Sequence, residues 1–450
     1  MQHVARSHII ASQQTSLGST ASRHRERCQS PKLRMMASTN RIVELSAIIA
    51  KGTETINNFL VEHKLPIPSL DEDAISSSPI PGDAIDVKAV RATVTDACSE
   101  LNALLTGPEH LLRFEWTAFS SVKAILRFNL DRSFPIGGST TFEAMSTFSG
   151  LNVMNVRRIV RHAIINHYFF REKSPGIITH SALTATLARD DLARNHFLVR
   201  LDEFWPAATR LADAMEKWPN SQESSKAAFT LVNNSAMGMY EILAENRDRA
   251  ERFGMYFCHP DESPLVLVDN YQWAEKRTMV DVGGSHGHIV RSIAERFPHM
   301  KCFVQDLPDT VAVGAARLPV ELKDRVIFMA HDFFTEQPVK ADVYYFRSIF
   351  HNWADEYCIK ILQNLVPALE RGARVVIHDR ILPRFEDMST PEARNAINMD
   401  VGMLSLLNSQ QREMHEWPEL FRRADSRFRY MGARQPVGTI RWLIEAEWEG

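Results

Sequence analysis

A histidine with an acid at the end of a second apolar run is the clearest sign of chemistry in this sequence. His351 lies in Phe346-Arg-Ser-Ile-Phe-His-Asn-Trp353, after an apolar run and before a helical pattern that starts near Asp355. A neutral imidazole has a pKa close to working pH, so it suits a general base. Asp379 could hold that imidazole in the required tautomer. We interpret His351 as a base oriented by Asp379; the alternative is a structural histidine.

A glycine-rich turn marks a second site. The segment Thr278-Met-Val-Asp-Val-Gly-Gly-Ser-His-Gly-His288 passes from an apolar run into glycines, and a helical pattern begins at Ile289. Gly283, Gly284 and Gly287 let a ligand approach the backbone, and the first N–H groups of the helix face that ligand. We therefore predict a small-molecule site; the alternative is a glycine turn of the kind found in many α/β proteins.

The residues beside this turn favour a cationic cofactor. The glycines do not follow G-x-G-x-x-G, and the Lys-Ser/Thr of a phosphate-binding loop is absent. Asp281 would repel a pyrophosphate but suits the sulfonium and amino groups of S-adenosylmethionine. Asp306 follows the next apolar run, where an acid can accept hydrogen bonds from ribose hydroxyls. The sequence predicts S-adenosylmethionine, with a nicotinamide-dependent oxidoreductase as the alternative.

Alternating strand and helix patterns must position these residues. Five apolar runs separated by helical patterns predict an α/β fold: a doubly wound, Rossmann-like parallel sheet with helices on both faces. Ligands in such sheets lie beyond the carboxyl ends of the strands, so the strand-end residues should converge on one edge. The expected strands are Thr278–Val282, Lys301–Gln305, Val326–Ala330, Val343–Phe346 and Val375–His378, and the expected helices are Ile289–Phe297, Thr310–Arg317 and Tyr357–Glu370.

From about Ser120 to the C-terminus, the chain resembles the S-adenosylmethionine-dependent O-methyltransferases of the plant caffeate and flavonoid type. Within them it is similar to the fungal secondary-metabolite branch, which acts on phenolic natural products. Four blocks carry the resemblance, in the order and at the spacing of the family. They are Asp281-Val-Gly-Gly-Ser-His-Gly287, Val304-Gln-Asp-Leu-Pro308, His331-Asp-Phe-Phe334 and Phe346-Arg-Ser-Ile-Phe-His-Asn-Trp-Ala-Asp355.

The resemblance implies roles for individual residues. His351 would deprotonate a phenolic hydroxyl while its oxygen attacks the methyl group of S-adenosylmethionine. The family brackets this histidine with two acids; Asp379 matches the first, usually glutamate, and the second falls on Gln411. An amide can orient an imidazole but brings no charge, so a non-catalytic, methyltransferase-like binding or regulatory protein remains an alternative. The implied cofactor-binding residues are Gly283, Gly284, Asp306, Leu307, Asp332, Phe333 and Arg347, with Asp332 and Phe333 flanking the adenine and Arg347 where the family often has lysine.

The N-terminal half predicts a different domain, because 450 residues can fill two cores. Thr141–Leu187 has the pattern of helix, turn, helix and wing. Its arginines Arg157, Arg158 and Arg161 could contact DNA phosphates, but the formal charge of −3 argues against nucleic-acid binding. In the resembling family such a winged-helix-like module dimerises and closes the partner's substrate pocket. We predict a homodimer, with a mostly helical dimerisation and substrate-pocket domain at 41–255 and an S-adenosylmethionine-binding catalytic domain at 256–450.

Two methionines are candidate contacts for an aromatic small-molecule substrate. Met237 lies in Ser235-Ala-Met-Gly-Met-Tyr240, whose adaptable sulfur side chains suit a flat ring. Met403 falls where the resembling family clamps its substrate. A role in core packing is the alternative for the Ser235–Tyr240 segment.

Composition limits the remaining possibilities. Residues 1–40 hold six Lys/Arg and only one acid, Glu26, and we expect a disordered or mis-annotated extension. No apolar run approaches the ~20 residues that span a membrane. Five scattered cysteines without a Cys-x-x-Cys pair favour reduced thiols in the cytoplasm and no zinc site. We interpret His286 and His288 as loop side chains near the cofactor, so no metal is expected.

Overall fold

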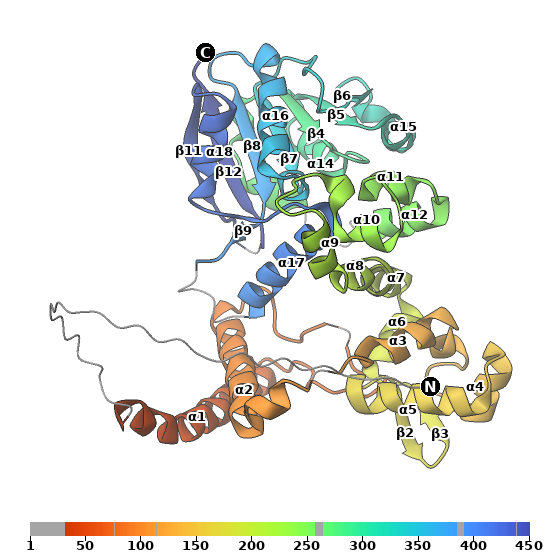
Figure 1. The fold of residues 1–450 in the computed structure, drawn as a ribbon. Helices are drawn as coiled ribbons and strands as arrows, with labels where there is room; N and C mark the ends of the chain where they lie inside the picture. The colour runs from red at the N-terminus through yellow and green to blue at the C-terminus, as the bar shows by residue number, and fades with distance from the viewer. Residues whose placement is uncertain (1–31, 76, 114, 257–263, 385–390, 438) are drawn as a thin grey trace, which may run out of the picture.

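The computed structural model describes residues 32–75, 77–113, 115–256, 264–384, 391–437 and 439–450 (Figure 1). The described part begins inside the predicted N-terminal extension, with a helix at Lys32. The expectation for residues 1–31 lies outside the described residues. None of the described helices has the length and apolar character needed to cross a membrane.

A seven-stranded sheet forms the C-terminal half, in the order β11-β12-β8-β7-β4-β5-β6. The five predicted strands are confirmed and run parallel. The sheet is nevertheless mixed, because two antiparallel strands that we did not predict, β11 and β12, extend it beyond β8. The bounds are β4 Thr278–Val282, β5 Lys301–Asp306, β6 Val326–Ala330, β7 Val343–Arg347, β8 Arg374–Asp379, β11 Phe428–Arg434 and β12 Trp442–Trp448.

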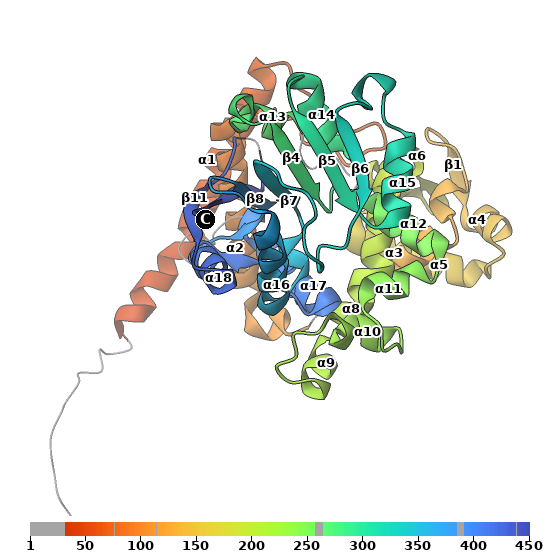
Figure 2. The ribbon, with the colours of Figure 1, turned by 90° about the horizontal axis from the view of Figure 1, so that it is seen from above.

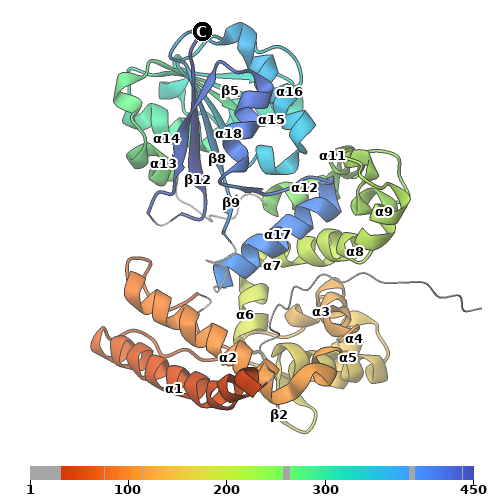
Figure 3. The same cartoon turned by 60° about the vertical axis from the view of Figure 1, so that its left-hand side comes forward.

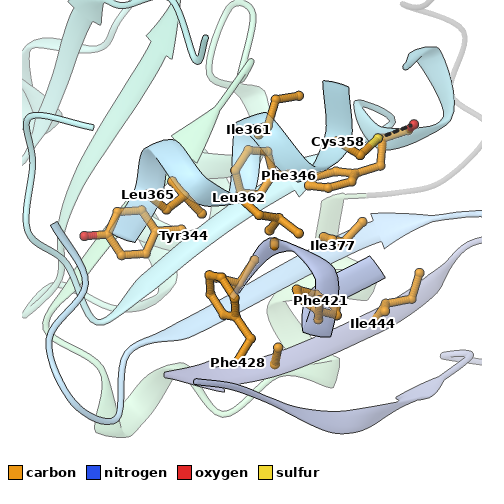
Figure 4. Close-up of a cluster of buried hydrophobic side chains, with 14 of the residues drawn as sticks. Tyr344, Phe346, Cys358, Ile361, Leu362, Leu365, Ile377, Phe421, Phe428 and Ile444 are labelled. Atoms are coloured by element: carbon orange, nitrogen blue, oxygen red, sulfur yellow. Dashed lines mark hydrogen bonds between the residues drawn. The ribbon is translucent and has the colours of Figure 1, made fainter. Parts of the chain in front are cut away.

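Helices cover both faces of this sheet, as predicted (Figure 3). On one face α16 (Asp355–Leu365) and α18 (Glu416–Ala424) bury a core with the strands, and Figure 4 shows part of it. On the other face, α13 (Pro264–Asn270) and α14 (His288–Arg296) bury a second core. Each fully buried large side chain contributes roughly 1.5–3 kcal/mol, so the two cores fix the strand ends in place. α15 (Pro308–Ala316) packs on β5 and β6.

The first two helices form an antiparallel pair beside the rest of the chain (Figure 1). α1 (Lys32–Glu62) and α2 (Ile85–Leu111) pack closely. A Cβ added to Gly52 would lie 2.3 Å from a methyl group of Val94, so only glycine allows this approach. α1 therefore packs against α2 of the same chain.

The predicted helix, helix and hairpin are present after α2. α4 (Phe142–Ser149) ends at Gly150, whose φ is +72°, and α5 (Val153–His167) precedes the strand pair β2 (Arg171–Ser174) and β3 (Ile177–Thr179). A third strand, β1 (Ser139–Thr141), pairs with β3. The guanidinium of Arg161 donates to Glu172 at 2.9 and 2.7 Å, so this arginine already has an anionic partner within the chain. The flanking helices are α3 Ala118–Arg127 and α6 Ala182–Arg189.

A bundle of short helices connects the two halves, and one helix of the C-terminal half packs among them. α17 (Pro391–Leu407) buries Met403, Leu406 and Leu407 against this bundle. Figure 2 shows α17 beside α8 and α10. α17 therefore belongs to the core of the bundle. The bundle comprises α7 Asp191–Val199, the π-helical η2 Arg200–Phe204, α8 Trp205–Ala208, α9 Leu211–Lys217, α10 Ala228–Val232, α11 Met239–Ala244 and α12 Arg247–Tyr256.

Candidate active site

The glycine loop after β4 has the conformation that its sequence predicts. Gly283 and Gly287 both have φ of +73°, in the left-handed region that favours glycine. A Cβ on Gly283 would lie 2.5 Å from Ile349, and one on Gly284 would lie 2.6 Å from the carboxyl carbon of Asp281. The loop therefore has no room for a side chain at Gly283 or Gly284.

The neighbouring strand β5 holds this loop. Gly283 N–H and Gly284 N–H donate to the carbonyl of Gln305 at 2.8 and 3.1 Å. The Asp306 carboxylate accepts from Ser285 N–H and Leu307 N–H, both at 2.8 Å. Burial raises the pKa of Asp306, and these two N–H groups oppose that rise. The side chain of Thr310 also hydrogen-bonds this carboxylate, whose two oxygens still have the capacity to accept from a ribose hydroxyl.

Asp281 lies beneath the loop and is buried, with 2% of its surface exposed. Burial raises its pKa to about 7; the charge of Arg347 opposes the rise and that of Asp306 adds to it. Arg347 ends β7, which is parallel to β4, so Arg347 lies at the same edge of the sheet as the loop. Asp281 and Asp306 thus both have a raised pKa, so they ionise less readily than exposed carboxyl groups. A bound cation would stabilise their ionised forms.

The next strand end carries the predicted adenine-side residues. Asp332 follows β6 and accepts from Phe334 N–H at 2.9 Å, so it also stabilises its own turn. The ring of Phe333 lies edge-on to those of Phe334 and Trp353, with centroids 4.9 and 6.0 Å away. His331 N–H donates to the carbonyl of Asp306 at 3.0 Å, which places these residues beside Asp306.

His351 is in the one-turn helix η6 (Phe350–Asn352), which follows β7. Its Nδ1 lies 3.3 Å from Asp379 Oδ1, and its backbone N–H donates to Asp379 Oδ2 at 3.1 Å. The amide nitrogen of Gln411 lies 3.3 Å from the same Nδ1. Among the residues that the structure describes, His351 Nε2 is buried and has no hydrogen-bond partner. The structure thus brings the three predicted catalytic residues together around the imidazole.

The surroundings of His351 keep its imidazole neutral. Burial lowers its pKa, the carboxylate of Asp379 opposes this, and the nearby guanidinium groups of Arg441, Arg380 and Arg412 lower it further. Near neutral pH the imidazole can therefore accept a proton.

A parallel strand pair brings Asp379 and Gln411 together. β9 (Ile381–Leu382) follows Asp379, and β10 (Arg412–Glu413) follows Gln411. Asp400 of α17 accepts from Gln411 N–H at 2.7 Å. We did not predict these two-residue strands or the role of Asp400, and no periodicity in so short a segment could have indicated them.

The two candidate substrate residues share one apolar cluster. Met403 is a buried member of it, and Met237 is a partly buried one that packs against it. Met399, one turn before Met403 on α17, packs there too. The cluster joins the helical bundle to the helix that holds Gln411, which is compatible with both the substrate role and the core role.

The helical bundle also reaches the cofactor loop. Tyr240, at the start of α11, is 41% exposed as a whole residue, but desolvation of its hydroxyl and the negative charge of Asp306 raise its pKa. The hydroxyl of Tyr240 therefore lies within electrostatic range of Asp306. We had noted this residue only as part of its methionine-rich segment, and a tyrosine at a helix start carries no sequence signal for such a contact.

The described residues contain no group of three His, Cys, Asp or Glu side chains that could hold a metal ion. His286 and His288, on the cofactor loop, belong to no such group. Among the cysteines that the structure describes, Cys98 is exposed and Cys302 and Cys358 are buried, all as free thiols.

Residues 226–427 match the model of a family described as the O-methyltransferase domain. The chain is 34% identical to the O-methyltransferase AMT9 of Alternaria alternata, over 91% of this chain and 98% of that protein. It is 36% identical to the grayanic acid biosynthesis cluster O-methyltransferase of Cladonia grayi, over 91% and 88%. It is 33% identical to the chlorophenol O-methyltransferase of Trichoderma longibrachiatum, over 91% of each.

The fold is that of solved methyltransferase-like structures. The crystal structure of OxaC in complex with S-adenosylhomocysteine (SAH) and oxaline superimposes with a TM-score of 0.69 and 21% identity, over 91% of this chain and all of that one. At this identity the likeness concerns the fold alone.

Proposed function

This chain belongs to the S-adenosylmethionine-dependent O-methyltransferases, in the branch of fungal secondary-metabolite enzymes, and we propose that it methylates a phenolic hydroxyl of an aromatic natural product. His351 is the general base of this proposal. The observation that carries it is the buried, unpartnered Nε2 of an imidazole whose other nitrogen faces Asp379. The family match also sets aside the nicotinamide-dependent alternative.

The cofactor-binding part of the proposal rests on the loop and the acids around it. The glycines of the loop leave space that a Cβ would fill, and Asp306 keeps lone pairs for ribose hydroxyls. Gly283, Gly284, Asp306 and Leu307 would hold the nucleoside side, with Asp332 and Phe333 at the adenine and Arg347 nearby. When bound, S-adenosylmethionine supplies an electrophilic methyl group.

The chain's own residues supply proton transfer and orientation. A phenol has a pKa near ~10, so at neutral pH it is mostly protonated. Nε2 of His351 would take that proton as the oxygen attacks, and a positioned base is commonly worth about 10²- to 10⁴-fold in rate. Asp379 would accept from Nδ1–H and stabilise the imidazolium that forms.

Gln411 has a weaker role in this proposal. Its Oε1 is buried and has no partner among the described residues, while its Nε2 is the atom that faces Nδ1 of His351. When Nδ1 of His351 is protonated, a Gln411 amide rotated by 180° would place Oε1 beside the Nδ1–H group. Oε1 would then accept a hydrogen bond from Nδ1–H, which Asp379 also accepts. It would then orient the imidazole without adding charge.

The acceptor is proposed to lie against the apolar cluster that contains Met403 and Met237. A methionine-lined wall can adapt to a flat ring. The name of the Trichoderma relative, which is 33% identical, specifies a phenol as acceptor and supports that substrate class. Truncating Met403 to alanine should raise KM for the acceptor more than it lowers kcat.

The quaternary state and compartment are further parts of the proposal. We infer a homodimer formed through the N-terminal half, where side chains such as Leu105, Leu112 and Trp116 expose large apolar surfaces. The exposed free thiol of Cys98 suits a reducing, cytoplasmic compartment.

Substitution of the base tests the central step. In His351→Gln, turnover of a chlorinated phenol should fall at least about a hundredfold, because the proton acceptor is lost. Binding of S-adenosylhomocysteine, measured by calorimetry, should change little. His299→Gln is a matched control, because His299 is exposed and, within the part of the chain that the structure describes, hydrogen-bonds to the carbonyl of Lys276 far from His351 in the sequence. Wild-type turnover in His351→Gln would remove the base assignment. Cofactor binding without methylation of any phenol would favour a binding or regulatory protein.

A further inference from the structure

Arg412 is almost completely buried, with 1% of its side chain exposed. It lies against the turn Phe350–Trp353, the His351 turn. It directly follows Gln411 in the chain. A buried guanidinium is costly unless its donors are satisfied, so the identity of its partners indicates what it is there to hold.

Those partners are the backbone ends of the His351 turn. Arg412 Nη1 donates to the carbonyl of Phe350, and Nη2 donates to the carbonyl of Trp353, both at 2.9 Å. Phe350 immediately precedes His351, and Trp353 is two residues after it. The planar, forked guanidinium can span two carbonyls at a fixed separation, which a point charge cannot do.

One carboxylate fixes the guanidinium itself. Asp355 Oδ1 accepts from Arg412 Nε at 3.0 Å and from Nη2 at 2.9 Å. Asp355 is the first residue of α16, so this ion pair joins the His351 turn to a helix of the sheet core. The other oxygen of Asp355 accepts from Arg423 at 3.1 Å, and among the described residues no hydrogen bond links Arg423 to the turn.

The opposite side of the turn is fixed by Asp379. Its Oδ2 accepts the backbone N–H of His351, while Arg412 donates to the flanking carbonyls. Gln411 immediately precedes β10 and Arg412 begins it; the side chain of Gln411 reaches the imidazole, and that of Arg412 reaches the carbonyls. The turn is therefore clamped between Asp379 and Arg412.

We propose that Arg412 is a positioning residue for the methyl transfer, acting through the backbone of the His351 turn to hold Nε2 at its working distance from the acceptor hydroxyl. This inference rests on the proposed role of His351 as base. A displacement of about 1 Å at a reacting group can cost about a hundredfold in rate, so loss of the clamp should be visible in kcat.

Arg412→Lys is the main test variant, because it keeps the charge and removes the fork. A first measurement needs no acceptor: NMR of protein labelled only at histidine, saturated with S-adenosylhomocysteine, with the His351 signals identified by their loss in His351→Gln. Wild type and the control Arg423→Met should each show one sharp His351 environment. Arg412→Lys should show broadened or doubled signals. A single, unshifted His351 environment in Arg412→Lys would overturn the proposal.

The second measurement is turnover of a chlorinated phenol per cofactor-binding site, counted by calorimetric titration with S-adenosylhomocysteine. In Arg412→Lys, kcat should fall at least about tenfold while KM changes little, because only the geometry of the base is disturbed. Arg423→Met should keep wild-type kcat. A lower melting temperature with unchanged kcat per site would show a merely structural role.

A double variant separates this inference from the function on which it rests. If Arg412 acts only through His351, adding Arg412→Lys to His351→Ala should cost no further turnover. An additional tenfold loss in that background would contradict the proposal. Wild-type turnover in His351→Ala alone would instead contradict the assignment of His351 as the base. The NMR measurement would then still show whether Arg412 holds the His351 turn in one conformation.

The pH profile gives a further check with Arg412→Met, which removes the charge as well. The charged groups around His351 are Asp379, Arg380, Arg441 and Arg412. Losing one cation should move the acidic limb of kcat/KM to higher pH in Arg412→Met and leave it in place in Arg412→Lys. The same shift in Arg423→Met would show that the effect does not depend on contact with the turn.

Discussion

One carboxylate and one amide flank the imidazole of His351, so its pKa depends on few groups. Burial lowers that pKa below 6.5, and Asp379 is the group that opposes the shift. A base accepts protons only when neutral, so kcat/KM should rise with pH through the pKa of His351 and level off above it. Because the pKa is lowered, the midpoint of this acidic limb should lie below 6.5.

Replacing Asp379 tests the charged partner. In Asp379→Asn the imidazolium loses its stabilising charge, so the plateau turnover should fall by about tenfold or more, and the acidic limb should move to lower pH. Gln411→Ala should have the smaller effect, because it removes only an orienting amide. Rate measurements across the pH range check both variants. A greater loss in Gln411→Ala would contradict the assignment of Asp379 as the main partner.

A second carboxylate should shift the pH profile in the opposite direction. In Gln411→Glu the added negative charge favours imidazolium, which raises the pKa of His351 and moves the acidic limb to higher pH. The direction of this shift is the readout, and Gln411→Ala, which adds no charge, is the control. An unchanged limb in Gln411→Glu would show that residue 411 does not face the imidazole in the working enzyme.

The raised pKa of Asp281 makes a prediction about the cofactor. S-adenosylmethionine differs from S-adenosylhomocysteine by a methyl group and the sulfonium charge, so the ratio of their affinities reports mainly on the charge near sulfur. As pH rises through about 7, Asp281 ionises and should increase the preference for the sulfonium form by up to about tenfold. Calorimetry with both ligands measures the ratio. In Asp281→Asn the ratio should no longer depend on pH in this range.

At the scale of the elements, the close approach of the cofactor loop to β5 leaves no space for larger residues. Gly284→Ala would bring a Cβ to 2.6 Å from Asp281 and 2.9 Å from Val304. We expect affinity for S-adenosylhomocysteine to fall at least about tenfold, because the loop must move. Gly254→Ala on α12 is the control, since a Cβ there meets nothing within 4 Å. Equal affinity in Gly284→Ala would show that the loop adapts.

The parallel strands could be predicted because strands buried on both faces are continuous apolar runs. β12 was not predicted, although Trp442-Leu-Ile-Glu-Ala-Glu-Trp448 alternates apolar residues with acids, a pattern typical of a half-buried strand. Those acids pair with arginines across the sheet: Glu445 with Arg374 and Glu447 with Arg429. The place of β12 beside β8 depends on such long-range contacts. The order of the strands likewise follows from long-range packing.

The candidate site was predictable to the extent that strand ends determine it. The acids and His351 follow strands, so their convergence on one edge follows from the topology alone. Asp400, Arg412 and Tyr240 come from α17, β10 and α11, which reach the site through tertiary packing. Nothing in their local sequence distinguishes them from solvated or capping residues.

For the whole molecule, the exposed apolar side chains of the N-terminal half predict self-association. Three of these side chains have most of their surface exposed: Leu105 (66%), Leu112 (82%) and Trp116 (77%). Exposed apolar groups of this size are typical of a surface that is covered by a partner. Light scattering at micromolar concentration should give twice the mass of the chain, and Leu105→Glu with Leu112→Glu should shift it toward the monomer. Val437→Glu is a control at an equally exposed site, 82%, in the sheet half. A monomeric wild type would contradict the homodimer.

The packing of α17 into the helical bundle has a practical consequence for recombining this enzyme with its relatives. A chimaera joined near residue 255 would pair the bundle of one parent with the α17 of another. The side chains of Met403, Leu406 and Leu407 would then pack against residues that differ from those of their own parent. Exchanges intended to alter the accepted aromatic compound should therefore inherit residues 391–407 from whichever parent donates the bundle. Chimaeras that take the bundle and residues 391–407 from different parents should aggregate on expression, even when both parents are expressed as folded proteins.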